Sequence, residues 1–196
     1  MKQSSIKSSK FVGSLPPVDL DAVRKVNGDF GFRAASGPEI GDAVALAERL
    51  IGQRIADLDV LKRLHAHTTV SLWVLGDPVV GMHIMAPLTP AGERAVRRGE
   101  FRPENPDLNH CAAPGEPCGG VYVGIYAGET RDARRAIMQG AGVMRLMCFG
   151  TVPCFARAAT DDGARSMTSL GFHPIEGGLP GLWVQEALVN PSADAA

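Results

Sequence analysis

The fold is decided by residues 120–147, which read GVYVGIYAGETRDARRAIMQGAGVMRLM. Residues 120–127 form a short apolar run with two valines, an isoleucine and two tyrosines, which is typical of a buried strand. From Thr130 to about Phe149, small and apolar residues recur at helical spacing, which predicts a helix with one buried side. That side consists of Ala133, Ala136, Ile137, Gly140, Val143, Met144 and Met147. A buried strand followed directly by a long helix indicates an α/β chain.

The regions on either side of this stretch carry the same kinds of pattern. Strands are predicted at 30–34, 70–75, 79–85, 154–158, 172–175 and 181–185. Helices are predicted at 36–51, 55–64, 89–98 and 160–170, the last one ended by Gly171. The order is therefore β-α-α-β-β-(insert)-β-α-β-α-β-β.

The helix after Ser36 has the clearest start signal. Ser36 and Glu39 have the spacing of a capping box, in which each side chain meets the other residue's backbone amide, and Pro38 lies in the first turn. Ile40, Ala43, Ala47 and Ile51 follow on one face. We therefore expect this helix to pack its apolar side on the sheet.

Length and composition place the chain among single-domain proteins. It has 196 residues and a formal net charge of -1, which disfavours a nucleic-acid binder. It contains no long apolar run and no secretory signal, so we expect a cytoplasmic protein that does not enter a membrane. We divide it into a poorly ordered or weakly helical tail at 1–28, one domain at 29–188 with an insert at 88–119, and a second tail at 189–196.

Two segments near the C-terminus carry a family resemblance. Ala159-Thr160-Asp161-Asp162-Gly163 is followed, after a short helix, by Leu170-Gly171-Phe172-His173-Pro174. These segments and the order of elements resemble the GNAT superfamily of acyl-CoA-dependent N-acyltransferases over roughly residues 30–185. The resemblance implies a mixed central sheet of six to seven strands flanked by helices, with a V-shaped splay between the fourth and fifth strands.

The resemblance also implies where acetyl-CoA or another acyl-CoA binds. The backbone of Ile125 and Tyr126 would face the pantetheine arm, and the start of the next helix would face the pyrophosphate, where free amides favour anions. Thr160 is the remaining expected contact. The residues of the helix start are Arg131, Asp132, Ala133, Arg134, Arg135 and Ala136.

This helix start departs from the family pattern of Arg or Gln, two residues, Gly, one residue, and Gly or Ala. Arg131 and Ala136 match the outer positions, but Arg134 stands where the middle glycine is expected. One interpretation is that Arg131, Arg134 and Arg135 grip the phosphates directly. The alternatives are a degenerate loop that binds CoA weakly or not at all, and a solvated cationic helix start.

Catalysis requires a base for the amine and an acid for the leaving thiolate. The tyrosine that serves as the acid in the family corresponds to Met167, which cannot donate a proton. Tyr122 is a substitute hydrogen-bond donor, or else a core tyrosine. His83 and His110 are candidate bases, with a hydrogen-bonded structural histidine and an exposed loop histidine as the respective alternatives.

The four cysteines lack Cys-x-x-Cys spacing, so we expect buried thiols and no metal site. The resulting hypothesis is acetyl transfer to a small-molecule or peptide amine, with a homodimer as one oligomeric state left open. The alternatives are a catalytically degenerate domain that binds CoA or another phosphorylated ligand, and a purely structural module.

Overall fold

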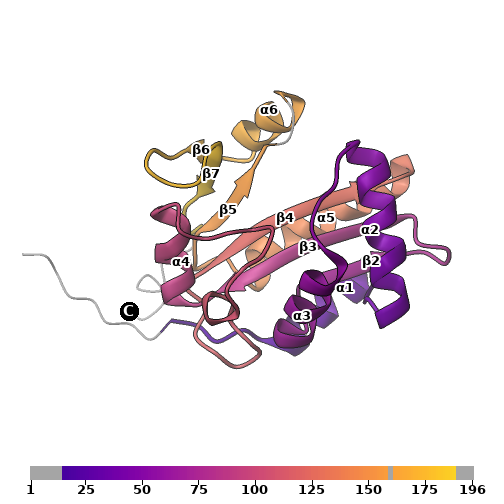
Figure 1. Ribbon diagram of the computed structural model, residues 1–196, viewed down its shortest axis with the longest axis horizontal. Coiled ribbons are helices and arrows are strands. Elements are labelled where there is room, and N and C mark those ends of the chain that lie inside the picture. The colour runs from indigo at the N-terminus through magenta and orange to yellow at the C-terminus, as the bar shows by residue number, and fades with distance from the viewer. Residues whose placement is uncertain (1–14, 159–160, 189–196) are drawn as a thin grey trace, which may run out of the picture.

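The architecture is a seven-stranded mixed sheet in the order β1-β2-β3-β4-β5-β7-β6 (Figure 1). We describe it from a computed structural model that covers residues 15–158 and 161–188. The strands are β1 Phe32–Ala34, β2 Leu72–Leu75, β3 Gly81–Leu88, β4 Gly120–Gly128, β5 Cys154–Arg157, β6 His173–Pro174 and β7 Leu182–Gln185. β4 and β5 are parallel and the other neighbouring pairs are antiparallel. From β1 onward, the predicted order of elements is confirmed.

Helices cover both faces of the sheet. They are α1 Leu20–Asp29, α2 Gly37–Ile51, α3 Leu58–Thr68, α4 Pro90–Arg97, α5 Arg131–Met147 and α6 Asp161–Ser169. α1 and α5 bury Val23, Ile137 and Met144 in a core against one face. α2 and α3 bury Ile40 and Leu61, among others, against the other face. In Figure 1, α5 lies behind the sheet, whereas α2 and α3 lie in front of it.

Helix α1 corrects the predicted domain boundary at residue 28. Asp19 caps the helix, since its carboxylate accepts the amide of Ala22 at 3.0 Å, and the helix runs on to Asp29. Val23 and Val26 are buried against α5 and the sheet. The boundary therefore cuts through a packed helix rather than separating a tail from the domain. Residues 1–14 of the predicted first tail, and 189–196 of the second, lie outside the described residues.

The predicted capping interaction forms at the start of α2. The Glu39 carboxylate accepts the backbone amide of Ser36 at 2.9 Å and the hydroxyl of Ser36 at 2.7 Å. These hydrogen bonds, together with Arg33, lower the pKa of Glu39 to about 2. The carboxylate therefore stays charged near the positive end of the helix, where it is favourable.

The insert at 88–119 packs against the domain. It contains α4 and a 3-10 turn η1, Leu108–His110, and residues 99–119 are otherwise mostly irregular, as predicted. Phe101 and Cys111 are buried in a third core with Tyr122 and Phe155. Gly92 makes this packing possible, because a Cβ there would lie 2.0 Å from the His110 carbonyl oxygen.

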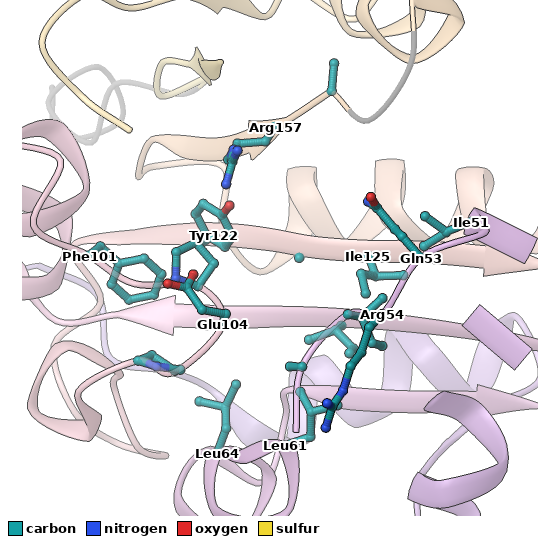
Figure 2. Close-up of a pocket in the computed structure, with 18 residues that line it drawn as sticks. Ile51, Gln53, Arg54, Leu61, Leu64, Phe101, Glu104, Tyr122, Ile125 and Arg157 are labelled. Atoms are coloured by element: carbon teal, nitrogen blue, oxygen red, sulfur yellow. The ribbon is translucent and has the colours of Figure 1, made fainter. Parts of the chain in front are cut away.

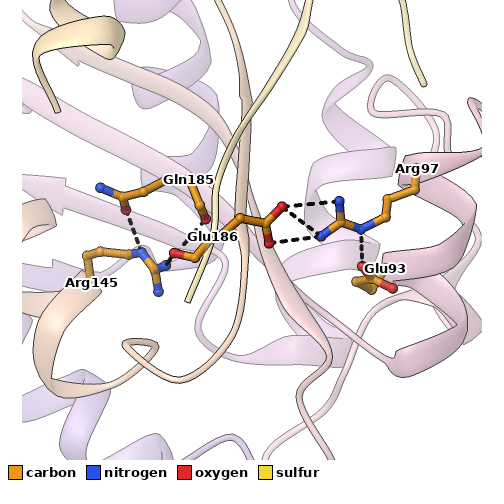
Figure 3. A network of polar contacts seen from close by, with 5 residues as sticks. All are labelled: Glu93, Arg97, Arg145, Gln185 and Glu186. Atoms are coloured by element: carbon orange, nitrogen blue, oxygen red, sulfur yellow. Dashed lines mark hydrogen bonds and ion pairs between the residues drawn. The ribbon is translucent and has the colours of Figure 1, made fainter. Parts of the chain in front are cut away.

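Charged side chains join the insert to the C-terminal strand region (Figure 3). Arg97 of α4 forms ion pairs with Glu93 and, at 3.2 Å, with Glu186. Arg145 of α5 donates to the Gln185 side chain at 2.7 Å and to the Glu186 carbonyl at 2.8 Å. The end of β7 is thus held between α4 and α5, which supports β5 beside it.

The predicted splay is present between β4 and β5. Their parallel pairing involves only Val121, Tyr122 and Val123 of β4, whereas β4 itself runs on to Gly128. Figure 1 shows β5 diverging from β4 toward α6. The two strands therefore separate in the middle of β4.

Candidate active site

Beyond Val123, the edge of β4 that faces β5 has no strand partner in the described chain. A bulge lies at the same point, because Met85 pairs with Val123 but Ile84 pairs with Ile125, which leaves Gly124 as the extra residue. Before the bulge, the amide of Val121 points toward β5 and donates to the Pro153 carbonyl at 2.9 Å. The bulge reverses which residues point that way.

After the bulge, the backbone groups of Ile125 and of Tyr126 point to opposite edges of β4. Glu129, next to β4, donates its amide to the Val80 carbonyl at 2.9 Å, and residues of an antiparallel pair alternate between facing the partner and facing away. The backbone of Ile125 therefore points toward β3, which corrects its predicted contact with pantetheine. The amide and carbonyl of Tyr126 point toward the open edge, where a ligand can bind them.

The N-terminus of α5 lies at the end of this open edge. Thr130 caps the helix, since its hydroxyl accepts the amide of Ala133 at 3.1 Å. The amides of Arg131 and Asp132 have no hydrogen-bond partner among the described residues. Ala133 is buried, Ala136 is half-buried, and Asp132 is exposed.

The three arginines of the first turns are exposed. Within the described residues, Arg131, Arg134 and Arg135 make no ion pair, and Glu129 beside them pairs with Arg49 instead. Arg134 folds back over the turn, donating at 3.4 Å to the carbonyls of Gly128 and Glu129. The positive charge is therefore not paired with a described carboxylate, which fits both an anion-binding helix start and a solvated cationic one.

A cavity of about 290 Å³ lies on the α2–α3 side of the same separation (Figure 2). Ile84, Tyr122, Gly124 and Ile125 form its floor on β3 and β4. Segments distant in sequence supply the walls. They are Ile51, Gln53, Arg54, Ile55 and Ala56; Leu61 and Leu64; Phe101, Pro103, Glu104 and Pro106; and Arg157 and Ala158.

Of the three predicted catalytic residues, Tyr122 lines this cavity, whereas His83 and His110 do not. Burial raises the pKa of its phenol to about 12, and the nearby Arg157 guanidinium offsets only part of that shift. Figure 2 shows the guanidinium pointing toward the Tyr122 hydroxyl. A thiol has a pKa of about 8.5, so this phenol is too weak an acid to protonate a thiolate efficiently, but it can donate a hydrogen bond.

His83 lies on the opposite face of the sheet and is hydrogen-bonded, which fits its alternative interpretation as a structural histidine. Its Nε2 lies 2.7 Å from the Asn27 Oδ1, and its ring contacts those of Phe32, Trp73 and Tyr126. Burial lowers the pKa of His83 to about 3, so the ring is neutral. Because it does not line the cavity, we withdraw it as a candidate base.

The other catalytic candidates also lie away from the cavity. His110 is in η1, with its ring centroid 6.5 Å from that of Phe101, and does not line the cavity. Met167 lies in α6 and is not a lining residue either. Thr160 lies outside the described residues. Glu104 and Arg157 line the cavity but were not predicted from the sequence, where the only signals were a charged residue in a long loop and another at the end of a buried strand.

The cysteines are free thiols, and burial raises the pKa of Cys111 to about 12 and those of Cys118, Cys148 and Cys154 to about 11. Thiols with such pKa values are weak nucleophiles at neutral pH. Within the ranges described, no three histidine, cysteine or acidic side chains are grouped to hold a metal ion. No helix there is long and apolar enough to cross a bilayer.

No protein-family model and no curated protein matches the sequence. The GNAT-like decarboxylase GphF in complex with isobutyryl-CoA superposes with a TM-score of 0.50 at 15% identity, covering 81% of this chain and 99% of the other. A structure from Corynebacterium glutamicum, described as histone acetyltransferase HPA2 and related acetyltransferase, superposes with a TM-score of 0.47 at 17% identity. The match covers 83% of this chain and 98% of the other. Mosquito arylalkylamine N-acetyltransferase like 5b superposes with a TM-score of 0.40 at 12% identity, and the match covers 88% of this chain and 98% of the other. The first likeness shows that this chain has a divergent GNAT-like fold.

Proposed function

We propose that this protein is an acyl-CoA-dependent N-acyltransferase, which takes acetyl-CoA or another acyl-CoA as the acyl donor. The observation that carries the proposal is that β4 continues for five residues beyond its last pair with β5, which leaves the backbone of Tyr126 at an open edge. An extended pantetheine arm can bind such an edge as an added strand does. The acyl group would then reach the place where the cavity begins, at Gly124 and Ile125.

The start of α5 would hold the phosphates of the donor. Its unpartnered amides and the helix dipole favour anions, and Arg131 and Arg135 add exposed positive charge. Arg134 occupies a glycine position of the family pattern, but its side chain lies over the turn that contains Gly128. The Arg134 side chain therefore does not cover the side of the α5 N-terminus on which Arg131 lies, and a phosphate group can approach there.

In the reaction, the amine nitrogen attacks the thioester carbon, the C–S bond breaks, and the thiolate leaves. The Glu104 carboxylate on the cavity wall can accept the proton that the amine loses. The Tyr126 amide can donate to the thioester oxygen as negative charge develops there. Tyr122 can donate a hydrogen bond in the cavity without giving up its proton.

Calorimetric titration with acetyl-CoA and with CoA tests donor binding, and thiol release with a panel of amines tests transfer. We expect both ligands to bind and at least one amine to accelerate thiol release. No heat at millimolar ligand would contradict the proposal.

The alternative is a domain that binds CoA without transferring an acyl group. Two observations favour it: Met167 stands at the position of the usual acid, and Arg134 replaces a glycine. CoA binding without acyl loss across the whole amine panel would support this alternative over the enzyme.

A further inference from the structure

The cavity wall carries two charged side chains of opposite sign that pair with no charged group of the described residues. Arg157 and Glu104 both line the cavity, and neither forms an ion pair within the part of the chain that the structure describes. Arg54, the other charged lining residue, is paired with Asp57. The cavity therefore offers one available cation and one available anion.

These two charges lie on the same side of the cavity as Tyr122. Figure 2 shows Arg157 above the Tyr122 ring and Glu104 below it, while Gln53 and Ile125 lie toward the other side. Both charges act on the phenol: Arg157 lowers the pKa of Tyr122 and Glu104 raises it. A guanidinium has five N–H donors, so contact with one hydroxyl leaves donors for a carboxylate.

The remainder of the lining is mostly apolar. Ile84, Leu61, Leu64, Phe101 and Ile125 contribute to it, and the volume of about 290 Å³ is at the lower end of the ~300–1,000 Å³ typical of ligand pockets. A small molecule fits this space better than a peptide does.

We infer that the acceptor is a free amino acid with an apolar side chain. Its carboxylate binds Arg157, its amino group lies near Glu104, and its side chain contacts the apolar lining. This inference rests on the proposed function and adds the substrate class to it. Arg157 acts here as a specificity-determining residue, because it selects acceptors that carry a carboxylate.

Calorimetry with L-leucine, isopentylamine and 4-methylpentanoate, with and without CoA, tests the inference independently of transfer. Isopentylamine lacks only the carboxylate of leucine, and 4-methylpentanoate lacks only its amine. We expect leucine to bind at least about tenfold more tightly than either, because each loses a charge-assisted hydrogen bond. Equal affinity for leucine and isopentylamine, or no binding of leucine, phenylalanine or methionine, would overturn it.

An arginine away from the cavity provides a matched control. Arg157→Gln should weaken leucine binding about tenfold and leave isopentylamine binding unchanged, whereas Arg24→Gln, on the exposed side of α1, should leave the binding of both unchanged. Leucine binding that is insensitive to Arg157→Gln contradicts the assignment. If the variant instead weakens succinyl-CoA relative to acetyl-CoA and spares leucine, the carboxylate belongs to the acyl donor and the acceptor assignment is wrong. Absence of thiol release with every amine, despite leucine binding, would count against the proposed function alone.

Discussion

His83 and Tyr122 are polar aromatic residues of adjacent strands, and both are only 5% exposed, yet they lie on opposite faces of the sheet. Tyr122 faces a cavity with charged walls, whereas His83 is enclosed by rings and one amide. The sequence placed both in strands but could not tell which face each would meet. Residue type alone therefore did not separate a cavity-lining residue from an enclosed one.

The lowered pKa of His83 predicts that the stability of the protein depends on pH. Its folded pKa of about 3 lies below the ordinary 6.5, so the unfolded chain binds the proton more readily. The contribution of neutral His83 to the free energy of unfolding is full above pH 6.5. It declines as the pH falls toward 3, by at most about 1.4 kcal/mol per pH unit.

The variant His83→Phe should remove this slope between pH 6.5 and 4.5 in urea denaturation. It should also cost about 1–3 kcal/mol at pH 7, since the buried Asn27 oxygen loses its partner. His173→Gln, at an exposed position of β6, is the control that keeps the slope. An unchanged slope in His83→Phe would show that another group is responsible.

At the scale of elements, apolar patterning and capping signals predicted most helices and strands, but two features depended on tertiary contacts. α1 has weak periodicity, and packing of Val23 and Val26 on α5 and the sheet stabilises it. The bulge at Gly124 is the second feature, because one extra residue reverses which backbone groups of β4 face the open edge. Hence Tyr126, and not Ile125, presents its backbone there.

Two glycines test how closely β4 and α5 must approach. At Gly128 a Cβ would lie 2.8 Å from the backbone nitrogen of Arg134, so Gly128→Ala should displace the start of α5. We expect a loss of about 1–3 kcal/mol in stability and weaker acetyl-CoA binding. Gly142→Ala on the same helix meets no atom within 4 Å and should stabilise the protein by up to about 1 kcal/mol. Denaturation and calorimetry of both variants measure this contrast; equal stability of the two would refute the close approach.

Across the complete fold, the order of elements from β1 onward and a mixed sheet were predictable, but the cavity was not. Its walls come from the end of α2, the loop after α4 and the end of β5, which are far apart in the sequence. Only the folded chain brings Arg157 and Glu104 to the same cavity. The arginine-rich start of α5, by contrast, is a local pattern and was visible in the sequence.

The charge at the start of α5 predicts how acyl-CoA binding responds to salt. The double variant Arg131→Gln, Arg135→Gln should weaken acetyl-CoA binding by about tenfold or more and reduce its salt dependence. Stability should change little, because neither side chain has an ion pair among the described residues. Calorimetry at two salt concentrations measures the effect, and Arg24→Gln, an exposed change on α1, is the control. Unaltered affinity in the double variant would place the phosphates elsewhere.

Amide hydrogen exchange at Tyr126, resolved by residue with and without acetyl-CoA, tests the open edge of β4 most directly. We predict that the Tyr126 amide exchanges rapidly in the free protein and is protected by acetyl-CoA, while the Ile125 amide is protected in both states by β3. A Tyr126 amide that is already protected in the free protein, or that saturating acetyl-CoA leaves unprotected, would contradict it.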